Sequence, residues 1–103
     1  MEYIKVKMPD GFWVVPVDII ADNRAKYFAE RDSDTTYEEE FNYTMSSHDE
    51  ISDWAKDNMN WSDVQKFARK LDSKILTKDD FEESWMNNDF EFVDEEDIND
   101  IKM

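Results

Sequence analysis

The first 17 residues show the alternation of apolar and polar side chains that is typical of short β-strands. Within residues 2–8, every second position from Ile4 to Met8 is apolar. Pro9-Asp10-Gly11 then has the composition of a turn, and β-branched and aromatic residues fill most of 12–17. The pattern therefore predicts an antiparallel β-hairpin with strands at about 2–8 and 12–17.

From residue 18 onward, apolar residues recur at intervals of three and four, which is the period of an amphipathic helix. Each run follows a residue whose side chain can cap a helix. These candidate caps are Asp18, Thr36, Ser47, Ser62 and Thr77. The sequence therefore predicts four or five short helices, at about 18–31, 36–45, 47–57, 62–71 and 78–87.

The C-terminal part combines a short apolar run with a block of acids. Residues 90–93 predict a third short strand. The acidic block then precedes Ile98 and Ile101, whose spacing suits either a last helical turn or a frayed tail over 94–103. Together the elements predict an α+β fold, a hairpin packed with helices, in a single domain spanning 1–103.

Aromatic residues on the apolar faces of these elements predict one aromatic-rich core. The expected core aromatics are Trp13, Trp54, Phe67, Phe81 and Trp85. Trp61 lies between two predicted helices and has two interpretations. It fills the corner between the helices, or it is an exposed anchor for a partner.

Composition narrows the class of protein. The 103 residues are 40% hydrophobic and 15% aromatic, which is typical of a folded chain. No Cys is present, so disulfides, thiolate zinc sites and a cysteine nucleophile are excluded, and a reducing compartment is favoured. No apolar run approaches the roughly 20 residues needed to cross a bilayer. We expect a cytoplasmic protein with no membrane contact.

Net charge is the outlying property, at −15 from 27 acids and 12 bases. A net charge with a magnitude of about 2 to 8 is enough to keep a small domain soluble. The excess grows along the chain. Residues 1–31 hold five acids and five bases, 32–76 hold eleven and five, and 77–103 hold eleven and two, so the net charge is 0, −6 and −9. The charge predicts a basic partner and disfavours direct binding of nucleic acid.

The residues that could carry catalysis do not form a recognisable motif. A nucleophile elbow, a phosphate-binding glycine loop and a metalloprotease motif are absent, and Gly11 is the only glycine. His48, the only imidazole, is expected on an exposed first helical turn. Acids paired by chance leave a small metal-assisted hydrolase as a third alternative, but we expect no enzyme, no cofactor and no dedicated metal site.

Carboxylates in rows offer a different chemistry, the imitation of nucleic-acid phosphates. If Phe81 and Trp85 face inward, nearby acids face outward, and Asp79 and Glu83 are about 6 Å apart along a helix. Two nucleotides of one DNA strand advance about 6.8 Å. The predicted partner-binding acids are Asp79, Glu82, Glu83, Asp94, Glu95, Glu96, Asp97, Glu38 and Glu39. The alternative is docking through an aromatic patch around Trp61, with the acids providing only solubility.

Three segments within residues 1–71, IKVKMPDG, IIADNRAKYFAERD and DWAKDNMNWSDV, resemble a set of short bacteriophage and mobile-element proteins of uncharacterised activity. The resemblance implies a viral context, with the host cytoplasm as the location, and it implies no site. Phages use acidic inhibitors against restriction and CRISPR enzymes. The expected partner is therefore a basic host protein: a nuclease, a restriction or CRISPR enzyme, or a transcription factor.

Overall fold

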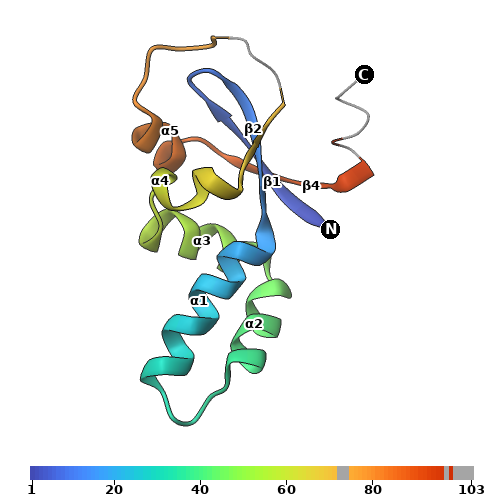
Figure 1. The fold of residues 1–103 in the computed structure, drawn as a ribbon, viewed down its shortest axis with the longest axis vertical. Helices are drawn as coiled ribbons and strands as arrows, with labels where there is room; N and C mark the ends of the chain where they lie inside the picture. Colours follow the sequence, from blue (N-terminus) through green and yellow to red (C-terminus); the bar gives the residue numbers. More distant parts are fainter. Residues whose placement is uncertain (72–74, 97, 99–103) are drawn as a thin grey trace.

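A computed structural model describes residues 1–71, 75–96 and 98, and it shows an α+β fold. A four-stranded antiparallel sheet has the strand order β3-β2-β1-β4, with helices packed against it (Figure 1). The predicted fold class is confirmed. No helix within these described ranges is long and apolar enough to cross a membrane.

The N-terminal hairpin forms as the alternation predicts. Strand β1 (Glu2–Met8) pairs antiparallel with β2 (Gly11–Pro16), and Met8 stands opposite Gly11 at the turn. Gly11 adopts a φ of 131°, a value that a Cβ would disfavour, so the glycine has a steric reason to be here. The second strand ends one residue early, because Val17 already belongs to the next helix.

Two further strands complete the sheet. Strand β4 (Phe90–Asp94) pairs antiparallel with β1, which confirms the strand predicted at 90–93. Strand β3 (Arg69–Lys70) pairs with β2 and was not predicted. Two residues are too few to give a readable alternation, and pairing with an existing edge supplies the hydrogen bonds that hold them.

The first three helices follow the predicted spans, although the first cap is wrong. Helix α1 (Val17–Arg31) has Pro16 at its N-cap, and Asp18 lies in its first turn and is not the cap. Helix α2 (Tyr37–Met45) begins after its predicted cap, Thr36, whose hydroxyl accepts the N–H group of Glu39 at 3.2 Å. Helix α3 (His48–Asn58) begins after Ser47, whose hydroxyl accepts the N–H group of Glu50 at 3.3 Å.

The predicted helix at 62–71 is wrong. Helix α4 (Trp61–Val64) is one turn long and is followed by a 3₁₀ turn, η1 (Gln65–Phe67), before the chain enters β3. The N-cap is Asn60, whose N–H donates to Asp63 Oδ2 at 2.8 Å, so Ser62 is not the cap. Pairing with β2 ends the helix early and leaves Phe67 50% exposed, which corrects its prediction as a core residue.

Helix α5 (Phe81–Asn87) starts later than predicted. Its N-cap is Asp80, which accepts the N–H groups of Glu82 and Glu83 at 2.9 and 3.3 Å, and not Thr77. A carboxylate is a stronger acceptor for two amide donors than the hydroxyl three residues earlier. Asp79 therefore precedes the helix and does not lie on it.

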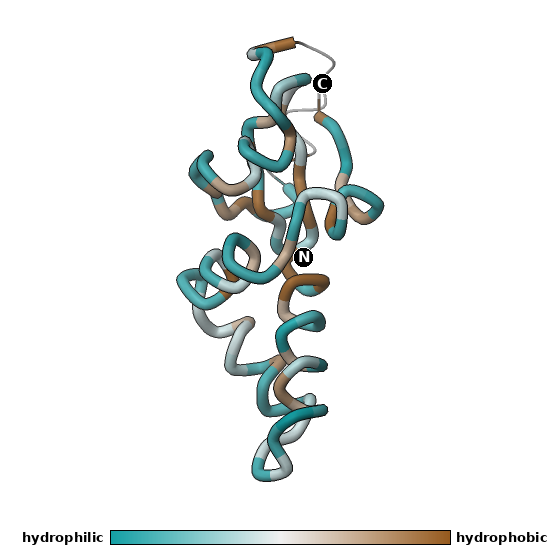
Figure 2. Tube along the Cα trace, turned by 90° about the vertical axis from the view of Figure 1, so that its left-hand side faces the viewer, coloured by the Kyte–Doolittle hydropathy of each residue, from teal (hydrophilic) through white to brown (hydrophobic). Residues whose placement is uncertain are grey.

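The core lies between one face of the sheet and the helices. Trp85 is fully buried against Trp61 and Phe90, while Trp54 is half-buried and donates to Asn23 Oδ1 at 2.8 Å. Figure 2 shows hydrophobic segments gathered in the strands and at the start of α1, with the far end of the α1–α2 hairpin mostly hydrophilic. Val15 of β2 belongs to this core, and because side chains alternate along a strand, its neighbour Val14 faces the other side of the sheet.

On that opposite side, Val14 and Val93 form a small second cluster with the buried Ile98. Glu95 and Glu96 are helical, and the N–H of Glu95 donates to the Met1 carbonyl at 3.1 Å. The alternatives predicted for 94–103 otherwise fall outside the described residues.

Candidate functional site

The ion pairs between described residues involve acids from the first half of the chain. Six acids, all in the first half of the chain, contact a described basic side chain: Glu2, Asp10, Asp22, Glu30, Glu40 and Glu50. Arg24 alone contacts Glu40 at 2.9 Å and Glu50 at 3.8 Å. Residues 77–103 hold eleven acids and two bases, so the negative charge is balanced least in the C-terminal third.

Two of the paired acids are fixed by hydrogen bonds. Burial works against the charge of Asp10, but hydrogen bonds from Trp13 and Lys70 outweigh it and hold the pKa of this carboxyl below its usual value. For Asp22, burial is again outweighed, here by Tyr37 and Lys26, and its pKa is also lowered. These acids stabilise the fold and are not free to bind a partner.

Helix α3 carries a row of three exposed acids that the sequence-based prediction missed. Asp49, Asp53 and Asp57 follow one another at four-residue intervals and are all exposed. None of them forms an ion pair with a described residue. Neighbouring carboxylates are about 6 Å apart along the axis. The repeat D-x-x-x-D-x-x-x-D is present in the sequence, but the spacing alone does not tell an exposed row from one that other segments cover.

The one base on the same helix does not neutralise this row. Lys56 Nζ donates to the carbonyl of Asn88 at 2.9 Å and lies 4.7 Å from the centre of the Phe90 ring. It therefore joins α3 to the segment after α5. The N-terminal end of α3 is fixed to the sheet, because His48 stacks on Phe92 at 3.8 Å and contacts Glu2 at 2.9 Å. His48 is exposed in the first turn, as predicted.

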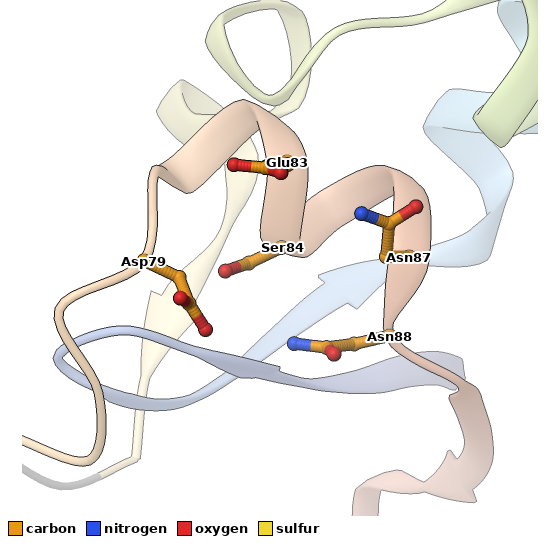
Figure 3. Close-up of a pocket in the computed structure, with 5 residues that line it drawn as sticks. All are labelled: Asp79, Glu83, Ser84, Asn87 and Asn88. Atoms are coloured by element: carbon orange, nitrogen blue, oxygen red, sulfur yellow. The ribbon is translucent and has the colours of Figure 1, made fainter.

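A cleft of about 130 Å³ lies along α5 and joins two of the predicted acids. We call it the α5 cleft, and its lining residues are Asp79, Glu83, Ser84, Asn87 and Asn88. Figure 3 shows the side chains of Glu83, Ser84 and Asn88 projecting to the same side, toward the side chain of Asp79. The lining is polar and includes no base. A larger groove of about 360 Å³ beside α1 includes Lys66 and the exposed Phe67, so it is not a site of one charge sign.

Glu82, predicted as an outward partner-binding acid, is held within the fold. Its two carboxylate oxygens accept the backbone N–H groups of Trp61 and Ser62, the second at 3.1 Å. The prediction treated α5 in isolation and had no information on which loop packs against it. The spacing argument for Asp79 and Glu83 is also wrong, because Asp79 lies outside the helix.

The remaining predicted acids are dispersed. Glu38 and Glu39 lie in the first turn of α2, and Glu39 Oε1 accepts the Thr36 hydroxyl of the cap at 3.3 Å. The start of α2 lies near the lower end of the helical hairpin in Figure 1, whereas α5 lies on the left and the end of β4 on the right of the upper part of the molecule. The predicted acids therefore do not form one continuous face. The remaining ones are Asp94, Glu95 and Glu96 after or at the end of β4, and Asp97, which lies outside the described residues.

Trp61 is a core residue, only 3% exposed, with its ring 5.3 Å from Trp13 and 5.7 Å from Trp85. Of its two interpretations, the structure supports the filled corner. Its indole Nε1 has no hydrogen-bond partner among the described residues. An aromatic docking patch centred on Trp61 therefore has no exposed surface.

Comparisons with protein-family models, curated proteins and solved structures give no match to this chain.

Proposed function

We propose that this protein is an acidic, phage-encoded binding protein that blocks a basic, nucleic-acid-binding host protein by mimicking phosphates. The α3 row is the observation that carries the proposal. Its three carboxylates are exposed, unpaired among the described residues, and about 6 Å apart. Two nucleotides of a DNA strand advance about 6.8 Å, so successive aspartates approximate alternate phosphates.

The energetic cost of this row supports a function. Like charges at i and i+4 each destabilise a helix by about 0.2 to 0.5 kcal/mol. The chain places Lys56 between them but directs its ammonium group to a backbone carbonyl across the interface with α5. A net charge of −15 exceeds what solubility needs, and it would steer the protein toward a positively charged cleft. A basic partner recovers the cost by pairing with the carboxylates.

The mechanism is competition. Carboxylates of α3 and the α5 cleft pair with lysine and arginine side chains of the host protein that otherwise bind phosphates. The host protein therefore cannot bind this protein and nucleic acid at the same time. The sequence resemblance to phage proteins supports a host nuclease, restriction or CRISPR enzyme, or transcription factor as the target, in the host cytoplasm. The docking alternative at Trp61 has no support, because that side chain is buried.

A displacement experiment tests the proposal. Nucleic-acid-binding proteins from a bacterial lysate are retained on immobilised duplex DNA at 150 mM NaCl, and the column is then developed with this protein. Polyglutamate at equal carboxylate concentration is the matched polyanion control. We expect a discrete protein to be released by this chain and retained under polyglutamate. Release of the same set by both, or of none by either, would refute specific mimicry.

A further inference from the structure

We propose that the outer edge of β4 binds an extended, basic segment of the partner through main-chain hydrogen bonds, a contact that rests on the proposed function for the charge of that partner. A strand at the edge of a sheet presents N–H and C=O groups that no neighbouring strand pairs with. The sheet ends at β3 on one side and at β4 on the other. Only the first of these sides is covered by described residues.

The outer side of β2 is covered by the segment that follows η1. Strand β3 pairs with β2, and just after β3 the N–H of Leu71 donates to the Phe12 carbonyl at 2.8 Å. Farther along, Leu76 and Thr77 both donate to the Pro9 carbonyl, at 2.9 and 3.2 Å. In the described part of the chain, no comparable segment pairs with the outer edge of β4.

The ladder between β1 and β4 identifies the main-chain groups that this edge presents. The N–H of Glu95 donates to the Met1 carbonyl at 3.1 Å, so Glu95 is at a hydrogen-bonded position. Bonding to the neighbour alternates along an antiparallel pair, so the residues two and four positions before Glu95 also bond to β1. Phe90 and Phe92 are at the alternate positions. Their N–H and C=O groups therefore point outward, where no described residue bonds to them.

Side chains on the core face of the sheet hold this edge in place. The Phe92 ring stacks on His48 with 3.8 Å between the ring centres, and the Phe90 ring lies 4.7 Å from the Trp85 ring. Lys56 Nζ lies 4.7 Å from the centre of the Phe90 ring. A strand that is already fixed loses little conformational entropy when another segment pairs with it. The edge is therefore prepared for main-chain pairing.

The charge beside the edge indicates which segment pairs with it. Residues 89–96 contain five acids and no base, and all five acids are exposed. A second copy of this chain pairing through the same edge would bring two such sets of acids together, and like charges across a strand pair are destabilising. An extended segment rich in lysine or arginine avoids this repulsion and gains main-chain hydrogen bonds, as in the addition of a strand to a sheet edge. The edge therefore fits a basic segment of another protein.

Amide NMR titration of the full chain in 150 mM NaCl tests this contact. The probe is the acetylated and amidated peptide KVKVKVK, and its controls are the same peptide with every main-chain nitrogen methylated and the acidic peptide EVEVEVE. We expect saturable shifts and slower hydrogen exchange of the Phe90 and Phe92 amides with the probe. Both controls should bind about tenfold more weakly, because the first lacks N–H donors and the second is repelled by the acids.

Two variants at one position separate the main chain from the side chain. Phe92→Pro removes the outward N–H, whereas Phe92→Ala removes the ring and keeps this donor, so the proline variant should bind the probe about tenfold more weakly than the alanine variant. The methylated peptide tests the same kind of bond without altering the protein. Asp89→Asn/Glu91→Gln should weaken binding about threefold, and the matched control Asp32→Asn/Asp34→Asn, in the turn after α1, should bind as the parent does.

Each other result would overturn the proposed contact. Equal binding of the methylated peptide would show only general charge attraction, and equal binding of the acidic peptide would contradict the preference for a basic segment. Shifts of the Phe90 and Phe92 amides that depend on protein concentration without peptide would assign the edge to a second copy. The DNA-column experiment separates the two proposals. Displacement without peptide binding removes the β4 contact alone, whereas peptide binding without displacement removes the proposed function and keeps the β4 contact.

Discussion

Replacing Glu82 by Gln should destabilise the protein, although an exposed acid in so negative a chain would ordinarily be expected to tolerate neutralisation. The two carboxylate oxygens of Glu82 accept the N–H groups of Trp61 and Ser62. Gln keeps one acceptor oxygen and turns an NH₂ group toward the second N–H. A hydrogen bond to a charged group contributes about 1.5 to 3 kcal/mol, and exposure to solvent reduces this. We expect a loss of about 1 to 2 kcal/mol.

The neighbouring Glu83→Gln is a matched control, because it makes the same change in charge one residue away. Glu83 has no ion pair within the described chain, and its amide variant should stay within about 0.5 kcal/mol of the parent or be slightly more stable. Urea unfolding followed by circular dichroism measures both. For a domain of this size, the Glu82→Gln loss corresponds to at least about 4 °C in melting temperature. Equal unfolding midpoints for the two variants would show that the Glu82 hydrogen bonds do not stabilise the α4 turn.

Two further predictions concern the core and the hairpin. Trp85→Ala should cost about 3 to 5 kcal/mol in urea unfolding, because the buried ring fills the space beside Trp61 and its Nε1 donates to the carbonyls of Ala55 and Met59 at 3.2 and 3.1 Å. Met86→Ala, at a side chain 58% exposed, should cost under about 0.5 kcal/mol. A small effect at Trp85 would contradict its place in the core. The lowered pKa of Asp10 means that its charge stabilises the fold above the unfolded pKa, near 3.9, and that this stability is lost as pH falls through the lower folded pKa. The stability difference between the parent and Asp10→Asn should therefore shrink as pH falls from 5 to 2, and a constant or growing difference would show that the Trp13 and Lys70 bonds do not favour the charged form.

Local patterns predicted the hairpin, β4 and the first three helices, because each depends on a signal contained in a short window. Alternation placed β1, and the Thr36 and Ser47 boxes placed α2 and α3. The helix predicted at 62–71 and the start predicted for α5 are wrong, because the structure of these segments depends on distant partners. Strand β3 needs the edge of β2, and the α4 turn needs the carboxylate of Glu82, 21 residues after Trp61.

The candidate site shows the same limit. Charge counting identified the acidic second half and two residues of the α5 cleft, Asp79 and Glu83. Composition alone does not tell an exposed acid from one that is hydrogen-bonded to the backbone, so Glu82 was assigned to the surface. The row on α3 is a simple four-residue repeat in the sequence, but it was not predicted, because its exposure depends on the helix packing through Ile51 and Ala55.

The most direct test of phosphate mimicry is the displacement of a host protein from duplex DNA by a variant that lacks the α3 row. Asp49→Asn/Asp53→Asn/Asp57→Asn removes three charges, and Glu30→Gln/Asp32→Asn/Asp34→Asn, at the end of α1 and in the turn that follows, removes the same number elsewhere. If each of the three lost contacts is worth about 0.5 to 1 kcal/mol, half-displacement at 150 mM NaCl should need about 10 to 160 times more of the α3 variant than of the parent. Its displacement should also depend less on salt, and the control should act as the parent does. Equal displacement by both variants at every salt concentration would contradict the account, because the α3 carboxylates would then be only a solvated surface.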